Sequence, residues 1–156
     1  MFRILVLLAV VFSGMVWISA AQEPRQTVAH PTATLPGVRL EINAAEFPSL
    51  QAAFDAIPPE GGVVRIPPGT FEISQPLILS RGDVLIQGAG TATHIKNINT
   101  DGQPALVVKH PDGEKVKPAD QLWRVMLSQF RITGQEKSGH GIEALLINEI
   151  FLQGVT

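Results

Sequence analysis

The chain has 156 residues, with 12 Lys and Arg against 14 Asp and Glu, and a formal charge of −2 at pH 7. This length suits a single domain. The charges are scattered and nearly balanced, which excludes the basic cluster typical of nucleic-acid-binding proteins. There is no cysteine, so apolar burial and backbone pairing, rather than disulfides, must stabilise the fold.

Residues 1–21 have the pattern of a signal peptide. Arg3 gives a positive start, residues 4–20 are almost entirely apolar, and Ser19 and Ala21 supply small residues at positions −3 and −1 for cleavage before Gln22. An uncleaved anchor is the alternative, because about seventeen apolar residues approach the length that spans a bilayer. Either form predicts export, to the cell envelope or out of the cell, with no other contact with a membrane.

Residues 22–37 are rich in Pro, Thr and Ala and have no periodicity, which predicts a flexible linker. Residues 38–156 then predict a domain that begins with a half-exposed strand at 38–42, where apolar and polar residues alternate.

A short amphipathic helix is predicted over residues 48–57. Pro48 suits the first helical position. An apolar stripe at spacings i, i+3, i+4 and i+7 is formed by Leu50, Ala53, Phe54 and Ile57. Since such a helix must bury its stripe, we expect it to cap the open end of a stack of strands.

Short strands with frequent corners follow the helix. We expect them at residues 63–66, 71–73, 77–79, 84–87, 93–96 and 105–109. Pro67, Pro68 and Gly69 predict a type II turn, and the polar residues 110–121 predict a projecting loop. Similar phrases end at Gly88, Gly134 and Gly154, and the last two lie about 20 residues apart, the length of one solenoid coil. The predicted fold is therefore an all-β, right-handed parallel β-helix with an N-terminal capping helix.

Three of these segments, residues 47–57, 61–71 and 84–90, resemble the N-terminal entry of the pectate-lyase-like superfamily of right-handed parallel β-helices. The resemblance implies an exported lyase or hydrolase of uronic-acid polymers such as pectin, with a polysaccharide as partner and, in the lyases, calcium as cofactor. The matched residues are structural in that family, so no catalytic, cofactor-binding or metal-ligating residue is assigned from it.

The residues themselves form no recognisable catalytic or ligand-binding motif. Gly88, Ala89 and Gly90 lack the third glycine of a dinucleotide-binding loop and predict a corner. His140 and Glu143 are three apart in a strand-like segment and would point to opposite faces, and Glu149 lies further on, so these three residues do not predict a metal site.

The remaining polar candidates also have structural interpretations. Asp112, Glu114 and Asp120 lack the spacing of an EF-hand. We expect Asp83 to lie at a corner and Trp123 to be a partly buried strand residue. Asn97, Asn99 and Asn148 would serve corners, because asparagine tolerates unusual backbone angles.

Thr156 falls within a strand-like pattern with no closing element, so we expect the chain to contain only the first coils of a longer β-helix, without its catalytic coils. Three functions remain open: a carbohydrate-active lyase or hydrolase; a non-enzymatic, adhesin-like module that binds polysaccharide at a surface; and a chain without activity of its own. The sequence does not decide the oligomeric state.

Overall fold

The computed structural model describes residues 39–156. The predicted signal peptide (1–21) and linker (22–37) lie outside the described residues. The described part is all-β with parallel strands and little helix, which confirms the predicted class. Within this part, no helix is long and apolar enough to cross a membrane.

The strands are short and every pairing between them is parallel. They are Leu40–Asn43 (β1), Gly62–Arg65 (β2), Gly69–Ile73 (β3), Leu77–Leu79 (β4), Val84–Gln87 (β5), Thr93–Asn97 (β6), Leu106–Lys109 (β7), Val125–Thr133 (β8), Ile142–Leu145 (β9) and Ile150–Val155 (β10). Those at 77–79 and 84–87 match the predicted bounds, and the strands predicted at 38–42, 63–66, 71–73, 93–96 and 105–109 differ by one or two residues at one or both ends. Strands β8, β9 and, apart from its last residue, β10 fall within the strand-like segments 123–134 and 141–154, of which the second contains two strands.

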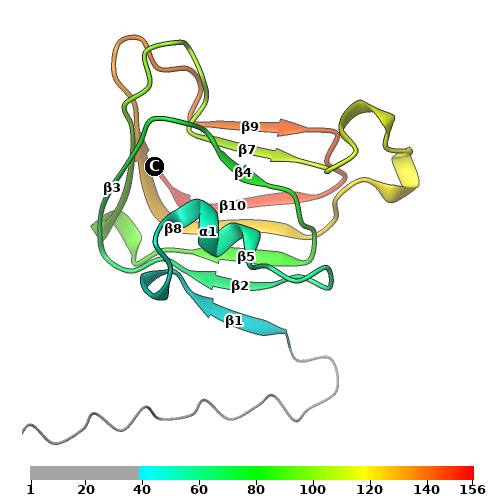
Figure 1. Cartoon of the computed structure of the whole chain (residues 1–156). Coiled ribbons are helices and arrows are strands. Elements are labelled where there is room, and N and C mark those ends of the chain that lie inside the picture. Colours follow the sequence, from blue (N-terminus) through cyan, green and yellow to red (C-terminus); the bar gives the residue numbers. More distant parts are fainter. Residues whose placement is uncertain (1–38) are drawn as a thin grey trace, which may run out of the picture. The chain divides into compact units, whose positions relative to one another are not determined.

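The strands form three ladders, and Figure 1 shows the strands of the first and the third running side by side within each ladder. The first ladder contains β1, β2, β5, the first half of β8, and β10; the second contains β3, β6 and the second half of β8; the third contains β4, β7 and β9. The nine-residue β8 passes from the first ladder into the second and so joins them into one curled sheet. From β2 onward the chain visits the three ladders in the same order, so neighbours in space are one pass apart in sequence.

Helix α1 (Leu50–Asp55) is shorter than the predicted 48–57 at both ends. Ser49 is its N-cap and accepts a hydrogen bond from the Ala52 N–H, so Pro48 precedes the helix instead of starting it. The predicted apolar stripe is buried, with Phe54 only 3% exposed, and the helix packs against β4.

Gln51 of α1 pairs with the backbone of β4. Its side-chain Oε1 accepts from the Ile78 N–H at 2.7 Å, and its Nε2 donates to the Ile78 carbonyl at 3.1 Å and to Asp55 Oδ1 at 2.8 Å. The amide therefore takes the place of a neighbouring strand at this edge of β4, where unpaired backbone groups would otherwise be exposed.

Two details of the sequence prediction are wrong, namely the alignment of one glycine in the repeat and the type of one turn. Gly134 does not align with Gly88 and Gly154; both of those glycines lie beside Gln129, inside β8. The reason is that Gln129, at φ 57°, turns the chain within a strand. The second error is at Gly69, whose φ of 151° is far from the value of about 80° in a type II turn.

Apolar side chains from all three ladders and from α1 form one core. Its most buried large side chains are Phe130, Leu79, Ile86, Ile95, Leu106 and Leu127. Asn97 and Asn99 are also buried, and both donate to the Gln103 carbonyl, at 3.0 and 2.6 Å. They hold the connection between β6 and β7 as predicted, but through these side-chain hydrogen bonds and not through unusual backbone angles, since neither has a left-handed φ.

Candidate functional site

The outer face of the first ladder carries a continuous row of apolar side chains, which we call the apolar row. In-register pairing places Val63 beside Leu85, Leu85 beside Met126, and Met126 beside Phe151. Their chain neighbours Val64, Ile86 and Leu127 point the other way and are fully buried in the core. Phe151 is 55% exposed, so this row is an apolar surface and not part of the core.

Charged side chains flank the apolar row on one side. Four first-ladder strands are each preceded directly by a charged residue: Arg39 before β1, Asp83 before β5, Arg124 before β8 and Glu149 before β10. Arg124 donates to Asp83 through Nε–Oδ1 at 2.5 Å and Nη2–Oδ2 at 2.9 Å. The charged residues and the apolar row together line a groove of about 470 Å³.

The Asp83–Arg124 pair depends on a stacked corner of the backbone. Gly61, Asp83 and Arg124 all have left-handed φ values, of 85°, 53° and 51°. The Gly62 N–H donates to the Asp83 carbonyl, and the Asp83 N–H to the Trp123 carbonyl. A Cβ on Gly61 would lie 2.2 Å from the Asp83 oxygen. Only glycine fits there, and the close stacking brings the two charged side chains together.

A second polar surface lies on the outer face of the second ladder. We call it the His94 cluster; its members are His94, Lys96, Arg131, Thr133 and Glu72. Arg131 Nη2 is 3.0 Å from His94 Nδ1, and His94 Nε2 is 2.7 Å from Thr133 Oγ1. Because a guanidinium only donates, Nδ1 must accept, so the ring proton is on Nε2 and is donated to Thr133.

Three titratable groups on these two surfaces have pKa values below their ordinary ones: Asp83, Glu72 and His94. The hydrogen bond from Arg124 lowers the pKa of Asp83, and that from Lys96, at 2.8 Å, lowers the pKa of Glu72. Partial burial, then the charges of Arg131 and Lys96, lower the pKa of His94. The two carboxylates are therefore poor general acids, and the lone pair of the neutral imidazole is already occupied. These surfaces are suited to binding rather than to proton transfer.

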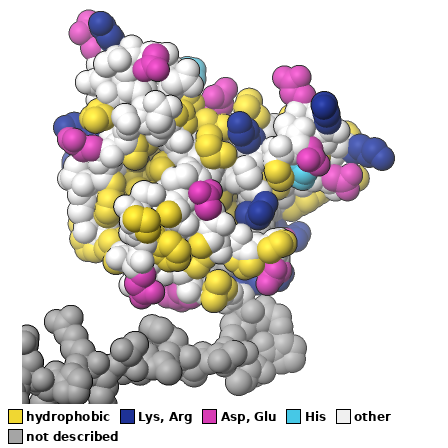
Figure 2. Space-filling view, viewed as in Figure 1, with side chains coloured by type: hydrophobic (Ala, Val, Ile, Leu, Met, Phe, Trp, Pro, Cys, Tyr) yellow, Lys and Arg dark blue, Asp and Glu magenta, His cyan; other side chains and the backbone are white. Residues whose placement is uncertain are grey.

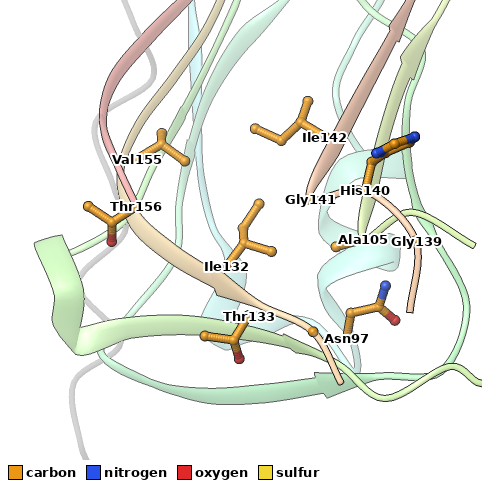
Figure 3. A pocket seen from close by; sticks show the side chains of 11 residues that line it. Asn97, Ala105, Ile132, Thr133, Gly139, His140, Gly141, Ile142, Val155 and Thr156 are labelled. Carbon is orange, nitrogen blue, oxygen red and sulfur yellow. The ribbon is translucent and has the colours of Figure 1, made fainter. Parts of the chain in front are cut away.

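A smaller hollow of about 320 Å³ lies between the outermost strands (Figure 3). The side chains of Ile132, Ile142 and Val155 point into it, and its lining is mainly apolar. His140 also lines it, whereas Glu149 lines the groove of the first ladder. The structure does not bring these two residues to one site.

The loop predicted at 110–121 projects from the body of the fold and bears charges of both signs (Figure 2). Asp112, Glu114 and Asp120 all lie on it. Among residues 39–156, no group of three or more His, Asp or Glu side chains is placed to hold a metal ion. Asn148 donates to the Pro118 carbonyl at 2.9 Å and tethers the loop. The prediction for Trp123 is wrong, because this residue lies before β8 and is 45% exposed.

Sequence reasoning singled out Asp83 but missed its partner Arg124, and it missed the His94 cluster entirely. The sequence did contain one signal, which is a pair of opposite charges or hydrogen-bonding side chains separated by the length of one pass through the three ladders. Glu72 and Lys96, for example, are 24 positions apart. His94 and Arg131 are 37 apart, because the 110–121 loop interrupts that pass. This longer interval cannot be recognised without the strand register.

The comparisons with known proteins inform the fold only. No family model and no curated protein match the sequence. Among solved structures, ORF18 of Geobacillus virus E2 is similar, with a TM-score of 0.56 and 22% identity. The likeness covers 67% of this chain but only 22% of that protein, so the chain spans less than a quarter of its neighbour's length.

Proposed function

We propose that residues 39–156 form successive turns of a right-handed parallel β-helix whose first ladder binds a glycan. The fixed order in which the chain visits the three ladders supports a helix of strands. The right hand is supported by the chirality of connections between parallel strands, which are right-handed in about 98% of cases. The pectate-lyase-like entry sequence is consistent with this architecture.

The observation that carries the glycan proposal is the exposed apolar row beside an ionised Asp83–Arg124 pair. Binding sites for small organic groups combine apolar contact with a few fixed polar groups that set orientation. A sugar ring offers both an apolar C–H face, which would pack on Phe151, and hydroxyl groups, which would bond to the carboxylate and guanidinium. The row crosses four strands, about 14 Å at the usual spacing, which favours an extended ligand.

A binding module is favoured over an enzyme for the described residues. Asp83 and Glu72 are each held ionised by a cation, which disfavours them as the general acid that glycoside hydrolysis requires. The uronic-acid lyase or hydrolase implied by the family resemblance, its calcium, and export through residues 1–21 stay predictions for the protein.

The test compares Phe151→Ala with Leu152→Ala. The two side chains are adjacent and equally exposed, at 55% and 57%, but only Phe151 is on the outer face of the ladder. The full chain would be titrated calorimetrically with a panel of neutral and acidic polysaccharides. Loss of one buried aromatic contact should weaken binding roughly tenfold or more in Phe151→Ala, while Leu152→Ala keeps the affinity of the unmodified chain.

Two outcomes would contradict the proposal: no polysaccharide binds, or both variants lose affinity equally. Release of saturated or unsaturated oligosaccharides from any bound polymer would instead identify an enzyme and refute the non-enzymatic assignment.

A further inference from the structure

Arg131, in the His94 cluster, has no acidic partner among residues 39–156. Two first-ladder arginines differ in this respect, because Arg65 is paired with Glu41 and Arg124 with Asp83. The only side-chain hydrogen bond of Arg131 in the described part goes to the neutral imidazole of His94. That bond uses one N–H of five and leaves the positive charge uncompensated.

Most groups around Arg131 add donors, and the one carboxylate of the cluster, Glu72, is bound to Lys96. Thr133 Oγ1 accepts the proton of His94 Nε2, so its own hydroxyl hydrogen is free to donate. Lys96 gives one N–H to Glu72 and has two left. Arg131 and Lys96 both lie close enough to lower the pKa of His94 by their charge, so two cations and a hydroxyl donor share one small surface.

The strand register holds these groups in place before any ligand arrives. His94 pairs with Arg131, and Lys96 with Thr133, across adjacent strands of the second ladder. Period-two alternation places all four side chains on the outer face, while Ile95 between them is 1% exposed and anchored in the core. A preorganised set of donors loses less conformational entropy on binding than a mobile one.

We propose that the His94 cluster is a binding site for an oxyanion, such as a sulfate, phosphate or carboxylate group. Arg131, Lys96 and Thr133 donate to the anion, and His94 is a positioning residue that orients the guanidinium of Arg131. Charge-assisted bonds from a planar guanidinium suit such groups. The site lies on a different ladder from the apolar row and does not depend on glycan binding there.

The experiment follows the His94 ring and Arg131 side-chain NMR signals of the full chain during a titration with sodium sulfate. Sodium chloride keeps the ionic strength constant. We expect a saturable shift, and roughly tenfold weaker binding in Arg131→Gln, which removes charge-assisted hydrogen bonds. Arg65→Gln removes the same charge from the first ladder and should bind sulfate like the unmodified chain, as should Phe151→Ala.

Two further measurements separate positioning from folding and identify the source of the anion. His94→Ala should weaken sulfate binding, and His94→Gln should restore it, because a glutamine amide can accept from Arg131 and donate to Thr133. Dextran sulfate is compared with neutral dextran: binding that needs both the sulfate groups and Arg131 indicates a polymer-borne anion, whereas free sulfate alone indicates a small ion. A non-saturable shift, or equal weakening in Arg65→Gln and Arg131→Gln, overturns the proposal.

Discussion

Three glycine-to-alanine substitutions test how the corners hold the first ladder in register. Gly61 has both a left-handed φ of 85° and no room, since an added Cβ would lie 2.2 Å from the Asp83 carbonyl oxygen. Gly102 has a similar φ of 75° but nothing within 4 Å of the added atom. Gly88 has no left-handed φ, but its Cβ would lie 2.3 Å from the Gln129 carbonyl oxygen. The three positions thus separate backbone strain from lack of space.

The expected losses in the free energy of unfolding follow from these two effects. Gly102→Ala should cost about 1 kcal/mol, because a left-handed alanine costs about 1–2 kcal/mol and the stiffer unfolded chain offsets part of it. Gly88→Ala should cost about 1–3 kcal/mol, as overpacking does. Gly61→Ala combines both and should cost about 2–4 kcal/mol.

The assay is urea unfolding of the full chain and the three variants, followed by far-UV circular dichroism. The predicted order of destabilisation is Gly61→Ala, then Gly88→Ala, then Gly102→Ala, with unchanged m-values. If Gly102→Ala is as destabilising as Gly61→Ala, the close contact with Asp83 does not constrain the fold, and our account of the corner is refuted.

Two further stability predictions concern side chains. Gln51→Leu should lower the free energy of unfolding by about 1–3 kcal/mol, because it leaves the Ile78 N–H and carbonyl unpaired, and Gln51→Glu should also be destabilising, because its carboxylate would replace the donor to the Ile78 carbonyl and to Asp55 Oδ1; urea midpoints equal to that of the unmodified chain would contradict this. His94 has a folded-state pKa below its ordinary 6.5, so the unfolded state binds the proton more readily. The contribution of the neutral ring to stability is therefore present above pH 6.5, and it is lost as the pH falls through the folded-state pKa. His94→Gln should therefore flatten the fall in urea midpoint on mild acidification, whereas a similar flattening in His140→Gln would count against this assignment.

Local patterns were sufficient to predict the elements but not their register. The stripe of Leu50 and Phe54 predicted the buried face of α1, and the apolar run at 84–87 predicted β5 with its correct bounds. The interior turn at Gln129 was not predictable, because no glycine or proline marks it.

The candidate sites depend on that register. Leu85 and Met126 become neighbours only after the polar loop at 110–121 is excluded from the pass between them. The partner of each outward side chain was therefore inaccessible from the sequence, even where its strand was predicted correctly. This explains why Asp83 was noticed without Arg124.

The apolar row also affects how the register of the first ladder is specified. A slip of one residue would exchange Val64, Ile86 and Leu127 for Val63, Leu85 and Met126 in the core, and both sets are apolar. Hydrophobicity alone thus specifies the register of this ladder weakly, and the close-packed corner at Gly61 must supply the specificity. Polar side chains in the row would leave a single register that buries apolar residues, so the apolar outer face makes the register of this ladder less well specified. Parallel sheets of α/β proteins are covered on both faces, and the glycan proposed for the apolar row would provide such cover on the first ladder.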